Sequence, residues 1–333
     1  MQIVNIHGPN DVRLDSARAP EPGPHDAIVS IEACGICGSD LTFIKQGGLP
    51  GAASPMPLGH EAAGRVIAVG SAVTDVEVGQ HVVINPVAAH GIIGNGGSEG
   101  AFTQQLLVRD AAAGKSLLPV PEGLSSEHAA LAEPLGVALH GVNRSGAKPG
   151  EKVVVFGCGP IGLGAIMWLR HNGVEDVVAV DVFDERLALA RAMGARATIR
   201  ADRDNLAERL RELHGTMEVL GRPVAGTDAY IDAAGAPSIV PDVVAMARTH
   251  ARLVVIALYT RNVELDLATM LLSEMSITTS MGYPDELDVV LGLLPGLTEK
   301  LDLLITHRFP FDQVIPAFDV AGKAHAGKVM IAF

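Results

Sequence analysis

Residues 153–165 read VVVFGCGPIGLGA, a short apolar run followed by a glycine-rich turn and a second apolar stretch. The run at 153–156 predicts a buried strand, and the residues near 161–171 predict a helix. The next apolar run, at 177–180, predicts a second strand and ends at Asp181. Strand, glycine turn, helix and strand in this order are typical of a parallel sheet with helices on its faces.

The alternation of apolar runs and helical patterns continues to about residue 280. The further elements predicted there are helices near 184–193 and 238–248 and strands at 229–232, 253–258 and 276–280. Before residue 140 the chain is instead rich in glycine and proline, with short β-branched runs between the turn residues. The strands predicted in this part are 27–31, 65–69, 81–84 and 102–108. A helix is expected at about 127–132, where Ser125 or Ser126 can cap its start.

These patterns predict an α/β protein with two domains and a tail. We place a β-rich domain at residues 1–143 and a nucleotide-binding domain, with a doubly wound parallel sheet, at residues 144–283. The tail, residues 284–333, contains a helical pattern at 285–294 and a strand-like run at 328–331. We expect this tail to return to the first domain.

The glycine turn, Gly157-Cys158-Gly159-Pro160-Ile161-Gly162, fits the G-x-G-x-x-G pattern of dinucleotide-binding sheets. Its glycines allow a tight turn and a close approach of pyrophosphate, and the helix that follows favours an anion at its start. Asp181, 19 residues after Gly162, would bind the adenosine ribose and repel a 2′-phosphate, which predicts NAD rather than NADP. The pattern also fits an S-adenosylmethionine methyltransferase, or glycines that serve packing alone.

Three segments of the first domain carry potential metal ligands. They are Cys34-Gly35-Ile36-Cys37, then His60-Glu61, then Glu133. A thiolate, an imidazole and a carboxylate suit a catalytic zinc with one open position, which lowers the pKa of a bound oxygen to near neutrality. Other interpretations stay open at this point. Cys34 and Cys37 could form a redox pair, His60 could be a structural histidine, and the two glutamates could be ordinary surface or helix-start carboxylates.

Four segments, taken together, carry a family resemblance. They are ACGICGSD (33–40), PLGHEAAGRVIAVGSAVTDVEVGQHV (57–82), AEPLGVALHG (132–141) and VVVFGCGPIGLGA (153–165). In this order they resemble the zinc-dependent medium-chain dehydrogenase/reductase superfamily, which includes the alcohol dehydrogenases. The form Glu133-Pro134-Leu135 is most similar to the polyol branch, with sorbitol, butanediol and threonine dehydrogenases. The resemblance implies a GroES-like catalytic domain and a Rossmann NAD-binding domain.

The resemblance implies a zinc site in the first domain. Cys37 and His60 would bind one catalytic zinc. The third protein ligand would be Glu61 or Glu133, with the other carboxylate close by or binding through water. Asp40 would orient His60 from behind, as metal-bound imidazoles generally require.

The same resemblance assigns proton transfer and cofactor binding. Ser39 would pass the substrate proton outward. Thr42 stands where polyol and alcohol members usually have a relay histidine, and a hydroxyl does not titrate near pH 7 as an imidazole does. What replaces that histidine stays open. Asp181 would bind the adenosine ribose, and the pyrophosphate would contact Gly157, Gly159, Pro160, Ile161 and Gly162.

Besides Thr42, the sequence differs from the family pattern at the structural zinc, which many relatives hold on a lobe with four closely spaced cysteines. The corresponding stretch, about 85–102, contains no cysteine. We therefore predict one catalytic zinc per chain and no structural zinc.

The leading hypothesis is a zinc-dependent oxidoreductase that transfers a hydride between a secondary alcohol or polyol and NAD, reversibly giving the ketone. The identity of the alcohol is left open. Two alternatives are a zinc-independent quinone or enone reductase of the same superfamily and a non-catalytic NAD-binding regulatory protein. Because family members are dimers or tetramers, we expect a homodimer or a homotetramer.

Composition limits the possible partners. The chain has 333 residues, with 25 lysines and arginines against 38 acidic residues, and a net charge of −13. This acidic balance argues against nucleic acid or an anionic membrane as the main partner. No apolar run approaches the length of a membrane span. The first 20 residues carry charges and prolines where a secretory signal needs an apolar core, and the three cysteines form no disulfide framework, so we expect a cytoplasmic protein.

Overall fold

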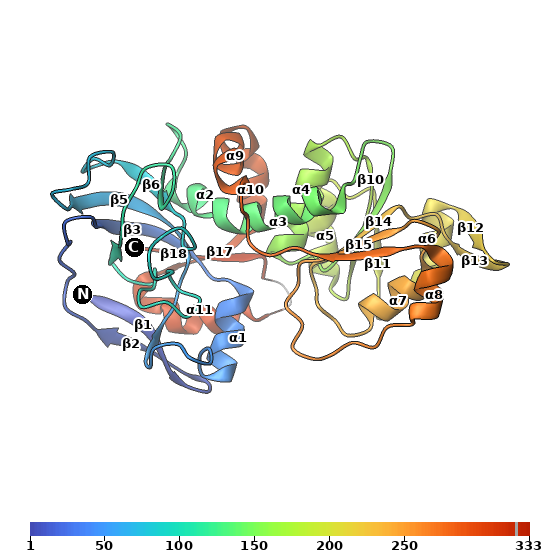
Figure 1. The fold of residues 1–333 in the computed structure, drawn as a ribbon, viewed down its shortest axis with the longest axis horizontal. Coiled ribbons are helices and arrows are strands. Elements are labelled where there is room, and N and C mark those ends of the chain that lie inside the picture. The colour runs from blue at the N-terminus through green and yellow to red at the C-terminus, as the bar shows by residue number, and fades with distance from the viewer. Residues whose placement is uncertain (324–325) are drawn as a thin grey trace. The chain divides into compact units, whose positions relative to one another are not determined.

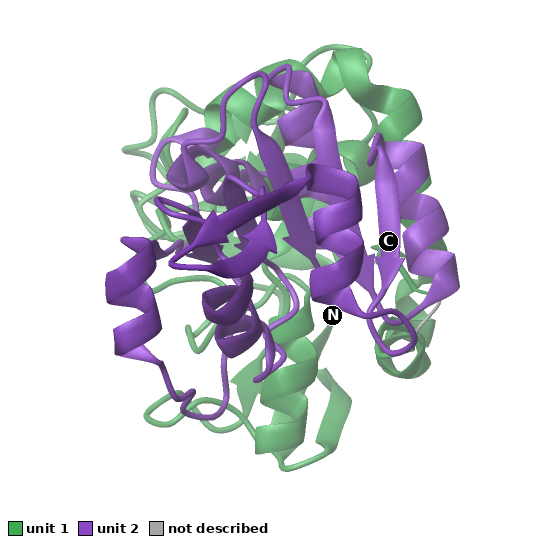
Figure 2. Ribbon diagram, turned by 90° about the vertical axis from the view of Figure 1, so that its right-hand side faces the viewer, with its two compact units in different colours: residues 1–134, 287–333 green, residues 135–286 purple. Residues whose placement is uncertain are grey.

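The computed structural model describes residues 1–323 and 326–333, which form two compact units (Figure 2). Unit 1 contains residues 1–134 and 287–333, and unit 2 contains residues 135–286. None of the described helices combines the length and the apolar character that a bilayer crossing requires.

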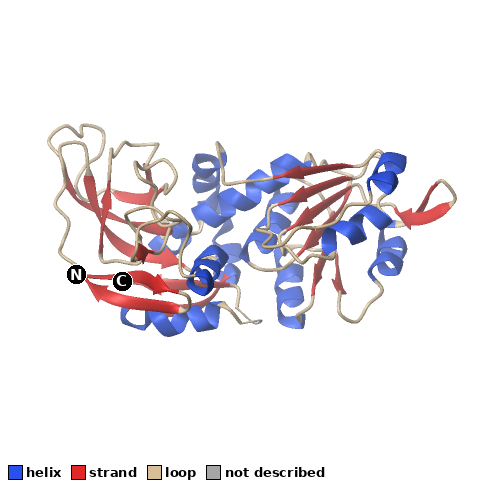
Figure 3. Ribbon diagram, turned by 60° about the horizontal axis from the view of Figure 1, so that its bottom comes forward, coloured by secondary structure: helices blue, strands red, loops and turns tan. Residues whose placement is uncertain are grey.

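Unit 2 is built around a six-stranded parallel sheet. Its strands, in spatial order, are β11 (Ala197–Arg200), β10 (Asp176–Asp181), β9 (Lys152–Phe156), β14 (Ala229–Asp232), β15 (Arg252–Val255) and β16 (Ser276–Thr279). Helices lie on either side of these strands (Figure 3). They are α3 (Ala132–Ser145), α4 (Pro160–His171), α5 (Asp184–Met193), α6 (Leu206–His214), α7 (Ile239–Met246) and α8 (Leu267–Ser273). The strand order reverses between β9 and β14, as in dinucleotide-binding sheets, and the predicted doubly wound parallel sheet is confirmed.

Buried apolar runs explain why these elements form the centre of the unit. The three valines of β9 are fully buried, as a strand covered on both faces requires. Helix α4 is buried along its whole middle, from Gly162 to Leu169. The indole Nε1 of Trp168 donates a hydrogen bond to the backbone oxygen of Leu135 at 2.9 Å, and this places Trp168 in the core.

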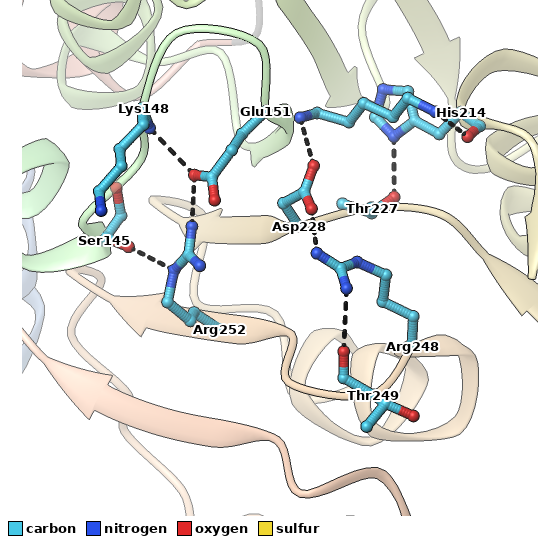
Figure 4. Close-up of polar contacts among 10 residues, drawn as sticks. Ser145, Lys148, Glu151, His214, Thr227, Asp228, Arg248, Thr249 and Arg252 are labelled. Atoms are coloured by element: carbon cyan, nitrogen blue, oxygen red, sulfur yellow. Dashed lines mark hydrogen bonds and ion pairs between the residues drawn. The ribbon is translucent and has the colours of Figure 1, made fainter.

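Polar contacts tie together the amino-terminal ends of the central strands (Figure 4). The guanidinium of Arg252 donates to the backbone oxygen of Ser145 at 2.8 Å and to the Glu151 carboxylate at 2.5 Å. The Asp228 carboxylate accepts a hydrogen bond from the backbone N–H of Lys152 at 2.7 Å. The glycine turn lies at the opposite, carboxyl end of β9, where such sheets bind their ligands.

Unit 1 contains two sheets. The larger has the order β17 (Ile305–Pro310), β18 (Lys328–Ala332), β3 (Ala27–Gly35), β5 (Glu61–Val69), β6 (His81–Ile84) and β8 (Leu117–Pro119), and β7 (Gln105–Val108) also pairs with β3. The smaller has the order β2 (Asp11–Ser16), β1 (Gln2–Gly8) and β4 (Met56–Pro57). The remaining helices are α1 (Gly38–Gln46), α2 (Ser126–Ala130), α9 (Glu286–Leu293), α10 (Thr298–Leu304) and α11 (Val314–Ala321), with short 3₁₀ turns at Leu294–Leu297 and Phe311–Gln313 (Figure 1). The predicted β-rich character of this part is confirmed.

Strands from distant parts of the sequence meet in unit 1. The last strand, β18, runs antiparallel to β3 and places Met330 opposite Gly35. On its other side β3 pairs with β5, which places Gly35 opposite Glu61. The carboxyl end of β3, the start of β5 and the start of β18 therefore come together beside Cys37.

Several elements differ from the prediction. Strand β5 begins at Glu61 rather than 65, and β7 begins at Gln105 rather than 102. A hairpin of β12 (Thr216–Val219) and β13 (Arg222–Ala225) extends from the body of unit 2 and was not predicted (Figure 1). Most of its positions are exposed, so its sequence lacks the alternation of apolar and polar residues that indicates a half-buried strand.

Candidate functional site

Cys37, His60 and Glu61 form the one group of three or more potential metal-binding side chains among the described residues. Their ligand atoms, a sulfur, a ring nitrogen and a carboxylate oxygen, all lie within 4.8 Å of one another. Cys37 immediately precedes α1, and Glu61 begins β5 directly after His60. His60 and Glu61 are buried and Cys37 is half-buried. This donor set in a partly accessible, otherwise buried position fits a zinc ion.

Glycines allow the backbone to pack tightly around this group. A Cβ atom at Gly35 would lie 2.1 Å from Oε2 of Glu61, so only glycine leaves room for the carboxylate. A Cβ atom at Gly94 would lie 2.6 Å from the backbone oxygen of Gly59 and 3.1 Å from the Cβ of His60. The glycine-rich stretch at 85–102 therefore supports His60 from one side.

Asp40 supports His60 from another side. Its Oδ1 lies 3.6 Å from Nδ1 of His60, and neither buried atom has a hydrogen-bond partner in the described part of the chain. Its Oδ2 accepts a hydrogen bond from the backbone N–H of Cys37 at 2.9 Å. Burial lowers the pKa of His60, but the nearby negative charges of Asp40 and Cys37 outweigh it and raise that pKa well above its usual value. A carboxylate beside one ring nitrogen is the arrangement that orients a metal-binding imidazole.

Lys328 completes this cluster and was missed by the sequence reasoning. Its Nζ contacts both carboxylate oxygens of Glu61 at 2.6 Å and the backbone oxygen of Ile36 at 3.0 Å. Burial lowers the pKa of Lys328, but the negative charges of Glu61, Cys37 and Glu133 raise it above its usual value. The one sequence signal that could have indicated this role is that Lys328 is a lone charged residue at the start of the apolar run KVMIA.

The other predicted residues of unit 1 lie outside the group of three. Glu133 is buried in the first turn of α3. Ser39 lies in the first turn of α1, and its hydroxyl oxygen is buried without a hydrogen-bond partner among the described residues. The hydroxyl of Thr42 donates to the backbone oxygen of Gly38 at 3.1 Å, so this hydroxyl is used within its own helix.

The three cysteines are all free thiols. Cys34 and Cys158 are buried, and burial raises the pKa of both thiols well above the usual range. A reactive thiolate at either position is therefore disfavoured. Cys158 acts as a small buried residue that fills the glycine turn.

The glycines of the turn after β9 have different structural roles. Gly157 has a φ of +85°, and a Cβ atom at Gly162 would lie 1.7 Å from the backbone oxygen of Gly157, so both positions need glycine. A Cβ atom at Gly159 would meet nothing within 4 Å. Gly159 is the N-cap of α4, and Pro160 and Ile161 begin the helix. Open space at a helix N-terminus fits an approaching phosphate group.

Asp181 ends β10 beside this turn and is 8% exposed. Its Oδ2 accepts a hydrogen bond from the backbone N–H of Cys158 at 2.7 Å. Its Oδ1 accepts hydrogen bonds from the backbone N–H groups of Val182 at 2.7 Å and Phe183 at 3.0 Å. These three bonds fix the carboxylate next to the glycine turn.

Comparisons with known proteins cover nearly the whole chain. The family model for the alcohol dehydrogenase GroES-like domain matches residues 23–133, and the model for zinc-binding dehydrogenases matches residues 160–294. Sorbitol dehydrogenase of Rattus norvegicus is 30% identical over 341 residues, which cover 98% of this chain and 94% of that protein. (R,R)-butanediol dehydrogenase of Bacillus subtilis is 29% identical over 338 residues, covering 95% and 94% respectively.

Solved structures show the same likeness in three dimensions. The structure of 2R,3R-butanediol dehydrogenase from Bacillus subtilis matches with a TM-score of 0.88 at 27% identity, covering 100% of this chain and 99% of that one. The structure of galactitol-1-phosphate dehydrogenase from Escherichia coli matches with a TM-score of 0.84 at 28% identity and covers both chains completely, at 100% each.

Proposed function

Because the chain belongs to the zinc-dependent medium-chain dehydrogenase/reductase superfamily, we propose that it oxidises a secondary alcohol or polyol to the ketone, reversibly, with NAD as the hydride acceptor. The observation that carries this proposal is the grouping of the Cys37, His60 and Glu61 ligand atoms within 4.8 Å. Relatives named as sorbitol and butanediol dehydrogenases support a small hydroxylated substrate.

The residues of unit 1 fit one zinc ion. Zinc held by Cys37, His60 and a glutamate would supply a Lewis acid that lowers the pKa of the substrate hydroxyl to near neutrality. The cluster geometry supports Glu61 as the third ligand. Glu133 is the alternative, because Lys328 already contacts both oxygens of Glu61. Asp40 would orient the imidazole.

Ser39 would accept the proton of the substrate hydroxyl and pass it outward. Its buried hydroxyl oxygen, which has no partner among the described residues, supports this role. Thr42 cannot replace the titration of an imidazole, and its hydroxyl already donates to the backbone of Gly38. The onward path of the proton would therefore need a group other than Thr42.

Unit 2 would bind NAD at the carboxyl ends of its strands. The pyrophosphate would contact Gly157, Gly159, Pro160, Ile161 and Gly162. The open space beside Gly159 supports this placement. Asp181 would accept hydrogen bonds from the adenosine ribose, and its negative charge would repel a 2′-phosphate. The proposal is therefore NAD rather than NADP.

The proposal divides these tasks along the chain. Residues 1–143 with the tail 284–333 would carry out catalysis, and residues 144–283 would bind NAD. The division of the compact units at 134/135 and 286/287 supports this assignment. We propose one catalytic zinc per chain and no structural zinc, because the stretch 85–102 contains no cysteine.

We also propose that the protein is located in the cytoplasm. Its three cysteines are all free thiols, which fits a reducing compartment.

We also propose that the protein forms a homodimer or homotetramer through the edge of the unit 2 sheet. Strand β16 ends the sheet and pairs with β15. Leu267, Leu271 and Met281 are 67%, 75% and 90% exposed. Pairing of two β16 strands about a two-fold axis would satisfy their backbone groups and cover apolar surface. Light scattering during size-exclusion chromatography tests this, and a monomer at assay concentration would overturn it.

The substrate assignment is tested by assaying secondary alcohols and polyols with NAD and with NADP, and quinones with NADH and with NADPH. We expect at least one secondary alcohol or polyol to be oxidised, faster with NAD than with NADP. Faster turnover with NADP would contradict the role of Asp181. Quinone reduction by the zinc-free protein would favour the zinc-independent reductase, and NAD binding without turnover would favour the regulatory protein.

A further inference from the structure

Arg200 lies at the carboxyl end of β11, next to Asp181. The two residues form the last registered pair between the parallel strands β10 and β11. Paired strands lie about 5 Å apart. An arginine is therefore placed beside the carboxylate to which we assign the adenosine ribose. Guanidinium is the side-chain group that best matches a phosphate, so Arg200 would by itself favour the 2′-phosphate of NADP.

Two aspartates form ion pairs with the guanidinium of Arg200. Its Nη1 contacts Oδ2 of Asp184 at 2.5 Å, its Nε donates to Oδ1 of Asp202 at 2.7 Å, and its Nη2 donates to Oδ2 of Asp202 at 3.2 Å. All three nitrogens of the group are thus engaged. The backbone N–H of Arg200 also donates to Asp204 at 2.9 Å, which fixes the start of the turn that carries Asp202.

Burial and charge agree with this arrangement. The Arg200 side chain is 18% exposed, whereas those of Asp184 and Asp202 are 66% and 45% exposed. The two carboxylates are thus more exposed than the guanidinium, and their two negative charges outnumber its single positive charge. Hydrogen bonding to Asp202 and Asp184 raises the pKa of Arg200 above its usual value. Arg203 lies farther out, with its Nη1 at 3.7 Å from Asp184.

We propose that Asp184 and Asp202 are specificity-determining residues that exclude NADP by holding Arg200 in ion pairs. This inference rests on the proposed nucleotide site and deepens it. Asp181 would repel a 2′-phosphate directly. Asp184 and Asp202 withdraw Arg200, a neighbouring group that would attract it. Removing Asp181 alone would therefore leave a site that still binds NADP poorly.

The test is calorimetric binding of 5′-ADP and 2′,5′-ADP, which needs neither zinc nor an alcohol. The variants are Asp181→Ser, the same with Asp184→Asn and Asp202→Asn, and that triple variant with Arg200→Gln. We expect the added Asn substitutions to increase the affinity for 2′,5′-ADP relative to 5′-ADP about tenfold, as a charge-assisted contact allows. Arg200→Gln should abolish this gain, whereas Arg203→Gln in the triple variant should preserve it.

Each outcome separates this inference from the nucleotide site itself. No gain in the triple variant, or a gain that survives Arg200→Gln, would overturn the role of the two aspartates and leave the proposed function standing. Failure of the unmodified protein to bind 5′-ADP at all would overturn the nucleotide site, and this inference with it. Asp184 and Asp202 are 66% and 45% exposed, so the Asn substitutions should not disturb folding. Asp181 is 8% exposed, so circular dichroism first checks that Asp181→Ser, the background of every variant, is folded.

Discussion

Lys328 Nζ lies 2.6 Å from each carboxylate oxygen of Glu61, and both side chains are at most 2% exposed. The two residues are 267 positions apart along the chain, yet strand pairing brings them into one buried ion pair. Because Glu61 is grouped with Cys37 and His60, the pair places the positive charge of Lys328 beside the potential zinc ligands.

We predict that Lys328→Met destabilises the zinc-free protein. The substitution leaves the Glu61 carboxylate buried without its partner, which costs about 3–5 kcal/mol for a buried pair. Urea unfolding of the chelator-treated protein measures this cost. The double variant Glu61→Gln with Lys328→Met is the matched control and should recover much of the loss. A loss below about 1 kcal/mol for the single variant would show that the pair is not buried as described.

The third zinc ligand is distinguished by two variants of equal size, Glu61→Gln and Glu133→Gln. Since Glu61 belongs to the group within 4.8 Å, we expect Glu61→Gln to weaken zinc binding strongly and Glu133→Gln to weaken it little. Competition with a chromogenic chelator gives both affinities. The reverse order would assign the ligand to Glu133.

Asp40 should control zinc affinity through His60. Asp40→Ala removes the carboxylate beside Nδ1 of His60 and the acceptor for the backbone N–H of Cys37. We expect zinc binding to weaken about 10–100-fold, the typical effect of removing a group that orients a ligand. Thr42→Val, on the same helix, serves as the control and should leave zinc affinity nearly unchanged. An Asp40→Ala protein with unaltered zinc affinity would exclude this role.

Two glycines of the turn should respond differently to alanine. A Cβ atom at Gly159 meets nothing within 4 Å, so Gly159→Ala should keep its melting temperature but bind NAD more weakly, because the methyl group fills the proposed pyrophosphate site. A Cβ atom at Gly162 would lie 1.7 Å from the backbone oxygen of Gly157, so Gly162→Ala should lose stability. Thermal unfolding and NAD titration separate the two effects. Unchanged NAD affinity in Gly159→Ala would argue against the proposed binding mode.

The free energy of unfolding should depend on pH through His214, which lies among the polar contacts at the amino-terminal ends of the central strands of unit 2 (Figure 4). Burial lowers the pKa of His214 to about 4, whereas an unfolded histidine titrates near 6.5. The unfolded state therefore binds more protons between these values, and the free energy of unfolding should fall as the pH drops from 6.5 towards 4.

The variant His214→Asn tests this dependence. An asparagine can keep the hydrogen bond that Nδ1 of His214 makes with Thr227 at 2.8 Å, but it does not titrate. Urea unfolding across this pH window should show a shallower slope for the variant. His250→Asn changes a histidine that is 69% exposed and should leave the slope as it is. Equal slopes for His214→Asn and the unmodified protein would refute the assignment.

Local sequence patterns were sufficient to predict the centre of unit 2. The valine run of β9, the glycine turn and Asp181 follow one another within 30 residues, and each has a direct steric or hydrogen-bonding reason. The first residues of β5 and β7 were less well predicted, because pairing with β3, rather than local composition, decides where these strands begin.

The metal group could be predicted only in part. Cys37, His60 and Glu61 carry donor atoms that stand out in the sequence, and the structure brings them together. Lys328 could not be predicted, because its partner is 267 positions away and no local pattern connects the two. The pairing of Arg200 with Asp184 and Asp202 was missed for another reason. Charged residues on a surface turn are common, and only the register of β10 and β11 gives these a place beside the nucleotide turn.

The most direct test of zinc-dependent alcohol oxidation is a measurement of NAD reduction together with zinc content, before zinc removal, after it and after zinc is restored. If Cys37, His60 and a glutamate bind a catalytic zinc, we expect one zinc ion per chain. Removing the zinc should lower alcohol-dependent NAD reduction at least about a hundredfold, and restoring the zinc should recover it. Full turnover by the zinc-free protein would contradict it.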